Sequence, residues 1–240
     1  MTLCPTLVCL PPAGAGPSLF RGWQRDDPQV IAPSLPGREA RYRDAAAPTL
    51  EALADLIAQD IGPTLPPQYG LFGYSMGGTV AMLLAERLIA RGCPPPQVVF
   101  TLGALAPDHL KDGTSRMHGQ DSAAFWDDIA RIGGTPDEIL QSAELRALFE
   151  PTLRQDFALC HGYTPAQPVF QVPCPVQVYV AQNDPFVGPD SAQDWARFTT
   201  DEVTFTPLEG NHMLDPDAFR ALRSRLLAHW PYAGRRQNAG

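Results

Sequence analysis

Residues 71–78 read LFGYSMGG, and this stretch decides the fold. Two large apolar residues lead into Ser75, which has glycines close on both sides. In a G-x-S-x-G pattern the serine lies on a sharp strand-to-helix turn that leaves room only for small neighbours. Residues 68–72 resemble a strand and 78–91 a helix, so the context fits. The stretch predicts a Ser75 hydroxyl at the carboxyl end of a sheet, where α/β proteins bind ligands; the alternative is a plain glycine-rich turn.

The rest of the chain alternates short β-rich runs with helical patterns. The β-rich runs show little polar alternation, which is typical of a mostly parallel sheet with helices on both faces. The other strands are predicted at 6–10, 29–32, 98–102, 176–181 and 203–205. The other helices of this core are predicted at 49–61, 190–198 and 216–230. We therefore expect the α/β fold class.

The segment from 108 to 169 breaks this rhythm, because it has no strand pattern. Helical spacing appears instead at 122–132, 137–141 and 144–159. We interpret about 107–168 as a helical lid inserted into a single domain that spans 1–230. The polar residues 231–240 are expected to form a disordered tail.

Composition narrows the classes of partner. Apolar residues make up 44% of the 240, enough for a core, and 18 basic against 26 acidic residues give a net charge of -8. Such a chain has no overall positive field for nucleic acid or an anionic membrane. The five cysteines show no C-x-x-C pair or zinc spacing, so we expect reduced thiols, no metal and no cofactor. The first residues lack a basic leader region, and we expect a soluble, cytoplasmic monomer.

A serine hydroxyl needs a base that is itself held by a carboxylate. In α/β-hydrolases the chain order is serine, acid, histidine. His212 follows the last predicted strand in the turn-like stretch EGNH and is the predicted base. Asp184, after the strand at 176–181, is the favoured acid, with Asp108 as the alternative. The remaining histidines are interpreted as structural or surface residues: His109, His118, His161 and His229.

An oxyanion hole requires two N–H donors. The first is predicted to be the backbone N–H of Met76, the residue after the nucleophile. The second should come from the loop PPAGAG at 11–16, where both prolines lack an N–H, so Ala13 or Gly14 must donate. The alternative is an ordinary glycine-rich loop.

Taken together, these motifs make the chain similar to the type II thioesterases of nonribosomal peptide and polyketide synthases, over about residues 6–230. LPGR followed by RY, and the lid pattern of GTP, EL and PTLRQDF, are the most distinctive features. The motifs of the resemblance are LPPAGAGPSLFRGW (10–23), VIAPSLPGREARY (30–42), GYSMGG (73–78), GGTPDEILQSAELRALFEPTLRQDFALCHGY (133–163), VAQNDPFV (180–187) and EGNHMLDP (209–216).

The resemblance implies an α/β-hydrolase core with a helical lid. It also implies hydrolysis of acyl thioesters on the phosphopantetheine arm of a carrier protein, with Ser75, Asp184 and His212 as the triad, and an editing role in natural-product synthesis. The chain departs from the family's usual residues at Pro12, Ala15, Tyr74 and Asn211. These departures bear on the shape of the pocket and on its acyl preference.

The lid is expected to shape the acyl site. Candidate substrate-contacting residues are Gly14, Tyr74, Phe125, Trp126, Ile129, Leu148 and Phe149. Apolar residues at helical spacing are also what a plain lid core needs, so that alternative stays open for the lid residues.

Carrier proteins are usually acidic, so a local basic patch would help this acidic chain to bind one. Arg38, Arg41 and Arg43 are the candidate patch, with solvated surface charge as the alternative. Two other functions stay open: another α/β-hydrolase chemistry, such as a carboxylester hydrolase or acyltransferase, and a non-catalytic binding module.

Overall fold

The computed structural model describes residues 5–117, 119–188 and 190–231. One sheet contains six parallel strands in the order β2-β1-β3-β4-β5-β6. The strands are β1 (Thr6–Leu10), β2 (Val30–Ile31), β3 (Tyr69–Tyr74), β4 (Val99–Leu102), β5 (Val176–Asn183) and β6 (Val203–Asn211). All six predicted strands are confirmed, and so is the parallel arrangement.

The last strand was predicted too short. The prediction ended at 205, but β6 continues to Asn211 and pairs with β5 as far as Asn183. Pro207 and Gly210 interrupt the sequence pattern and hide this extension. β6 is an edge strand. An edge strand tolerates proline because the backbone N–H groups on its outer side have no neighbouring strand to bond to.

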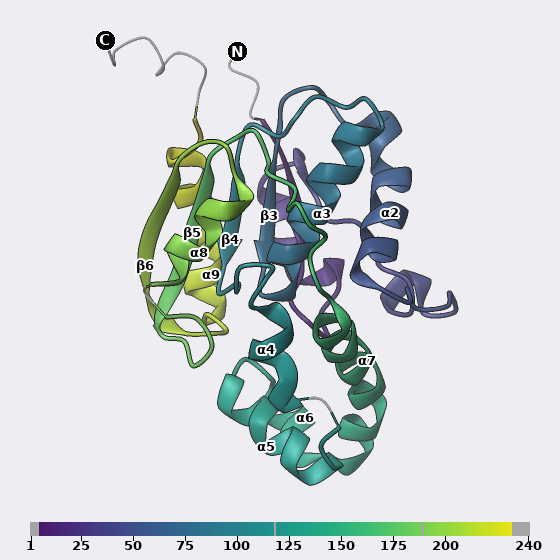
Figure 1. The fold of residues 1–240 in the computed structure, drawn as a ribbon. Helices are drawn as coiled ribbons and strands as arrows, with labels where there is room; N and C mark the ends of the chain where they lie inside the picture. Colours follow the sequence, from purple (N-terminus) through teal and green to yellow (C-terminus); the bar gives the residue numbers. More distant parts are fainter. Residues whose placement is uncertain (1–4, 118, 189, 232–240) are drawn as a thin grey trace.

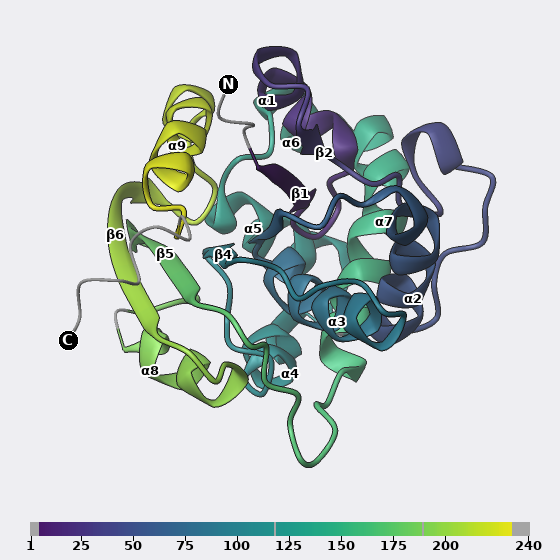
Figure 2. The ribbon, with the colours of Figure 1, turned by 90° about the horizontal axis from the view of Figure 1, so that it is seen from above.

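Helices cover both faces of the sheet (Figures 1 and 2). On one face lie α2 (Leu50–Ile61), α3 (Met76–Ala90) and α8 (Ser191–Trp195), followed by η5 (Ala196–Phe198). On the other lie α1 (Arg21–Asp26), preceded by η1 (Pro17–Phe20), and α9 (Pro216–Ala228). Short 3-10 turns elsewhere are η2 (Glu39–Arg41), η3 (Gly62–Thr64) and η4 (Ser115–Met117).

The central strands are apolar throughout because each supplies both layers of the core. In β1, Val8 and Leu10 pack on the side of α2 and α3, whereas Leu7 and Cys9 pack on the side of α1 and α9. Neither face of these strands meets water, so no polar alternation is needed.

The described chain between β4 and β5 has no strand up to residue 169, as predicted, and contains four α-helices, of which three were predicted and the first was not. These are α4 (Leu110–Thr114), α5 (Ser122–Ile132), α6 (Asp137–Gln141) and α7 (Ala143–Gly162), which we call the lid. They gather at one end of the sheet (Figure 1). Their small apolar core includes Phe125 and Ile129. The single-domain assignment of 1–230 stays a prediction, and the predicted tail lies outside the described residues apart from Pro231.

Candidate active site

Ser75 stands alone between the end of β3 and the start of α3. Its backbone has φ 52° and ψ −117°, a conformation that an L-residue adopts only under constraint. The Ser75 N–H donates to the Leu102 carbonyl of β4 at 2.8 Å, which anchors the turn to the neighbouring strand. The sharp turn predicted from LFGYSMGG is therefore present.

The glycines beside Ser75 allow the backbones to approach each other. A Cβ at Gly73 would lie 2.2 Å from the carbonyl oxygen of Gly77, inside van der Waals contact. A Cβ at Gly77 would lie 2.3 Å from the carbonyl oxygen of Leu10 at the end of β1. Because both neighbours are backbone atoms, the clash cannot be relieved by a rotamer change.

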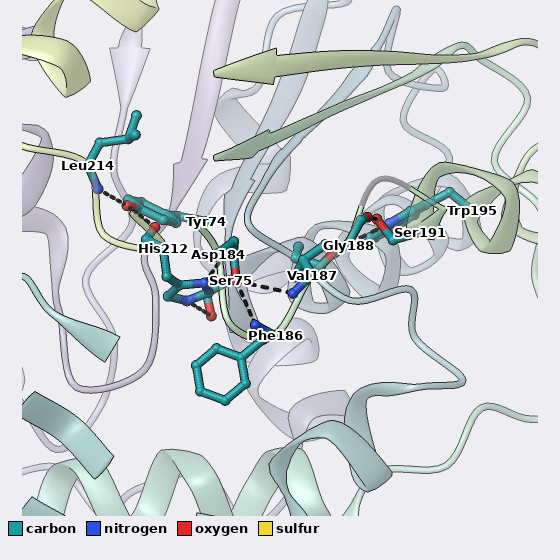
Figure 3. Close-up of polar contacts among 11 residues, drawn as sticks. Tyr74, Ser75, Asp184, Phe186, Val187, Gly188, Ser191, Trp195, His212 and Leu214 are labelled. Carbon is teal, nitrogen blue, oxygen red and sulfur yellow. Dashed lines mark hydrogen bonds and ion pairs between the residues drawn. The ribbon is translucent and has the colours of Figure 1, made fainter. Parts of the chain in front are cut away.

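Three side chains from the ends of three strands meet at this turn (Figure 3). His212, directly after β6, has its Nε2 3.1 Å from Ser75 Oγ and its Nδ1 2.7 Å from Asp184 Oδ2. Asp184 follows β5 directly. His212 is 4% exposed and the Asp184 side chain is fully buried, so the hydrogen bond between these two residues is shielded from water.

Asp184 is held by the backbone on its other oxygen. Its Oδ1 accepts the N–H groups of Phe186 and Val187 at 2.9 and 3.1 Å (Figure 3). Gly103, after β4, has φ +52°, and a Cβ there would lie 3.0 Å from Asp184 Oδ2. The alternative acid, Asp108, pairs instead with Arg197 and lies 3.9 Å from His109.

Tyr74 has a role that sequence reasoning missed. Its hydroxyl donates to the His212 carbonyl at 2.8 Å and accepts the Leu214 N–H at 2.8 Å (Figure 3). Burial raises the pKa of this phenol, so it stays a neutral donor. Tyr74 does not line the cavity beside Ser75, contrary to the expectation of substrate contact; it fastens the loop that bears His212.

The loop after β1 forms a tight turn. Ala15 N–H donates to the Pro12 carbonyl at 3.1 Å, and Gly14 has φ +78°, as the third residue of a type II turn requires. The Gly14 N–H is occupied, because it donates to Asp156 Oδ2 at 2.7 Å. Of the two residues left open by the sequence, Ala13 is therefore the better second donor. Met76 begins α3, where the first N–H groups of a helix lack intrahelical partners.

A cavity of about 280 Å³ lies between these residues and the lid. Its lining is mainly apolar and includes Ser75, Ala13, Gly14, Trp126, Ile129, Phe149 and Phe157. Two lid expectations are corrected. Phe125 is fully buried in the lid's own core, with the Arg154 guanidinium 4.3 Å from its ring centroid, and Leu148 is 67% exposed.

The expected basic patch is largely neutralised. Arg38 is 10% exposed on its side chain and pairs with the buried Asp156. Arg41 pairs with Asp44 and Asp60. Of the three, only Arg43, which lies over the ring of Tyr42, has no acidic partner within the part of the chain that the structure describes. Arg38 is therefore not available for docking.

The remaining candidate groups lie elsewhere. His229 Nδ1 meets the Tyr179 hydroxyl at 2.7 Å, and His118 lies outside the described residues. Burial raises the pKa of the Cys9 and Cys160 thiols, which suits inert core residues. Within the ranges that the structure covers, no group of three His, Cys, Asp or Glu residues could hold a metal ion.

Comparison with known proteins indicates the family of the chain. A family model described as Thioesterase domain matches residues 5–226. The thioesterase PikA5 of Streptomyces venezuelae is 30% identical over 234 residues, covering 93% of this chain and 80% of that protein.

Two solved structures extend the match. RedJ, the thioesterase from the prodiginine pathway of Streptomyces coelicolor, is 33% identical with a TM-score of 0.82, covering 95% of this chain and 89% of its own. YbtT, a type II thioesterase from the yersiniabactin NRPS/PKS pathway, is 25% identical with a TM-score of 0.79, covering 95% and 93%. In the described part of the chain, no helix is both long and apolar enough for a membrane span. The chain belongs to the thioesterase family and has the α/β-hydrolase fold of its type II members.

Proposed function

We propose that this protein hydrolyses acyl or peptidyl thioesters on the phosphopantetheine arm of carrier-protein domains, with Ser75 as nucleophile, His212 as base and Asp184 as the orienting acid. The observation that supports this most is the continuous chain from Asp184 Oδ2 through the His212 ring to Ser75 Oγ, at 2.7 and 3.1 Å. It opens onto an apolar cavity suited to an acyl chain.

The geometry suits a two-step acyl transfer. His212 Nε2 takes the Ser75 proton as the oxygen attacks the thioester carbonyl, and Asp184 stabilises the resulting imidazolium through Nδ1–H. The pantetheine sulfur leaves with the proton from His212. Water then attacks the acyl-serine with His212 again as base, which releases the acid and restores Ser75.

The developing oxyanion needs donors that are already in place. The Met76 N–H at the start of α3 is one, and the positive end of that helix adds a favourable field. We assign the second to the Ala13 N–H, because Ala13 shares the cavity with Ser75 and its neighbour Gly14 is already bonded.

The relatives set the biological context. YbtT is named for an NRPS/PKS pathway and RedJ for prodiginine biosynthesis, so we place this enzyme beside a natural-product synthase, where it removes acyl groups that stall the carrier. We also propose a cytoplasmic monomer.

The test is hydrolysis of a panel of acyl-loaded carrier proteins by the wild type and by Ser75→Ala. We expect release of free acid by the wild type and only background release by the variant. Hydrolysis by Ser75→Ala at the wild-type rate would exclude Ser75 as the nucleophile. Matched thioester and oxyester substrates, in the same assay, separate a thioesterase from a carboxylester hydrolase.

A further inference from the structure

Asp156 is a fully buried carboxylate on the lid helix α7 and is not a member of the proposed triad. Its Oδ2 accepts the Gly14 N–H at 2.7 Å and Arg38 Nη1 at 2.7 Å, and its Oδ1 accepts Arg38 Nη2 at 2.6 Å. A buried carboxylate is tolerated only when it is paired and hydrogen-bonded, and here its partners come from two separate loops.

Arg38 joins Asp156 to the turn at 12–15 by a further hydrogen bond. Its Nη1 also donates to the Ala15 carbonyl at 2.9 Å. The turn at 12–15 is thus held at Gly14 by the lid and at Ala15 by Arg38, on either side of one peptide unit. Glu39, next in the chain, accepts hydrogen bonds from the Ser18 N–H and hydroxyl, so the LPGRE stretch is also fixed to η1, which follows the loop.

Close packing reinforces the polar contacts. A Cβ at Gly14 would lie 2.3 Å from Leu153 Cδ2, so α7 rests directly on the turn. Leu153 and Gly14 both line the cavity beside Ser75. The turn therefore has its position set by the lid helix as well as by the sheet.

We propose that Asp156 and Arg38 are positioning residues that hold the turn at 12–15 in the conformation that presents the Ala13 N–H to the oxyanion. This inference rests on the proposed function. The lid helix α7 thereby becomes part of the oxyanion hole's support, and the hole is complete only while α7 is docked on the turn.

The experiment uses the full chain and an acyl N-acetylcysteamine thioester, with kcat, KM and the thermal midpoint measured together. Asp156→Asn removes the charge that both loops share. We expect kcat to fall by about 10²-fold, the effect of losing one oxyanion donor, with little change in KM. An acyl trifluoromethyl ketone, whose adduct with Ser75 resembles the tetrahedral intermediate, should lose affinity by a similar factor.

The double variant Arg38→Met with Asp156→Leu separates positioning from stability. Replacing a buried ion pair by apolar residues of similar volume is often neutral or stabilising, so the thermal midpoint of this variant should fall less than that of Asp156→Asn, which leaves Arg38 without its charged partner. It cannot accept the Gly14 N–H or donate to the Ala15 carbonyl, so we expect kcat to stay low. A stable double variant with wild-type kcat would overturn the proposal.

Asp27→Asn is the matched control. Asp27 is also a largely buried carboxylate that accepts a backbone N–H, from Gln29 at 2.9 Å, and pairs with an arginine, Arg223. We expect its loss to lower the thermal midpoint and leave kcat unchanged. Ser75→Ala tests the nucleophile independently: if that variant is inactive while Asp156→Asn keeps full kcat, only the positioning role fails.

Discussion

The hydroxyl of Tyr74 gives the sharpest test of how the site is held together. Tyr74→Phe removes a buried group that donates to the His212 carbonyl and accepts the Leu214 N–H, both at 2.8 Å. Each buried backbone group left without a partner costs about 1–3 kcal/mol, so the two together cost roughly 2–6 kcal/mol in the free energy of unfolding. For a chain of this size each kcal/mol lowers the thermal midpoint by about 2–4 °C.

The same change should slow the reaction. The His212 carbonyl belongs to the residue whose ring must meet Ser75 and Asp184, and a shift of about 1 Å at a reacting group can cost about 10²-fold in rate. We therefore expect kcat of Tyr74→Phe to fall by roughly one to two orders of magnitude, and KM to change little.

Tyr69→Phe provides the control at the opposite end of β3. Tyr69 is fully buried too, and its hydroxyl donates to one backbone carbonyl, that of Pro94, at 2.8 Å. Tyr69→Phe should lose less stability, because it leaves only one carbonyl, that of the exposed Pro94, without its partner, and it should keep wild-type kcat. Calorimetry and steady-state hydrolysis of one acyl thioester measure both quantities. Equal loss of stability in the two variants with wild-type kcat in both would refute the idea that Tyr74 positions His212.

Three further outcomes follow from the same geometry. Asp184→Asn should lower kcat by about 10⁴-fold, because the His212 tautomer is no longer fixed, whereas Asp108→Asn should leave kcat unchanged. A similar loss of kcat in both variants would contradict the choice of Asp184 over Asp108 as the acid. Gly77→Ala should prevent folding or abolish activity, because its Cβ would clash with the Leu10 carbonyl. Gly22→Ala is the control, because nothing lies within 4 Å of a Cβ at that position, and it should change neither the far-ultraviolet circular dichroism nor the rate of hydrolysis. Burial raises the pKa of four tyrosines, to about 12 for Tyr163 and Tyr179 and further for Tyr69 and Tyr74. Unfolded tyrosines ionise at about pH 10, so the stability that these four contribute should be constant below that pH and be lost above it. A thermal midpoint that does not fall above that pH would contradict these shifts.

Much of the fold could be predicted because parallel strands place their carboxyl ends at one edge. Ser75, Asp184 and His212 each follow a strand directly, so locating β3, β5 and β6 was enough to expect the three side chains together. The order of these three residues at the strand ends does not depend on the details of the lid. The extension of β6 was missed because local pattern breaks at Pro207 and Gly210 are overridden by pairing with β5.

The lid contacts could not be predicted because helical spacing does not tell which neighbour each face meets. One face of α5 lines the cavity, through Trp126 and Ile129. Another face packs against α7, where the ring of Phe125 contacts that of Phe157. Arg38 and Asp156 are 118 positions apart. Arg38 lies in LPGR and Asp156 in PTLRQDF, the two motifs that most distinguish the chain. Their opposite charges were the one available signal that these motifs are in contact.

The departures at Pro12 and Tyr74 can be understood from how each part of the site is supported. The residues of the proposed triad directly follow strands, and the missing side chain of Gly103 leaves the space that Asp184 Oδ2 and His212 Nδ1 occupy. Tyr74 supports the triad from the sheet, because its hydroxyl joins the end of β3 to the loop after β6 by a hydrogen bond. Pro12 belongs to the turn, whose position is set by side chains from the lid and from LPGR. Substitution at 74 should therefore act on the base, and substitution at 12 on the oxyanion. Variants at the two positions should combine additively in log kcat, and a clear departure from additivity would contradict this separation.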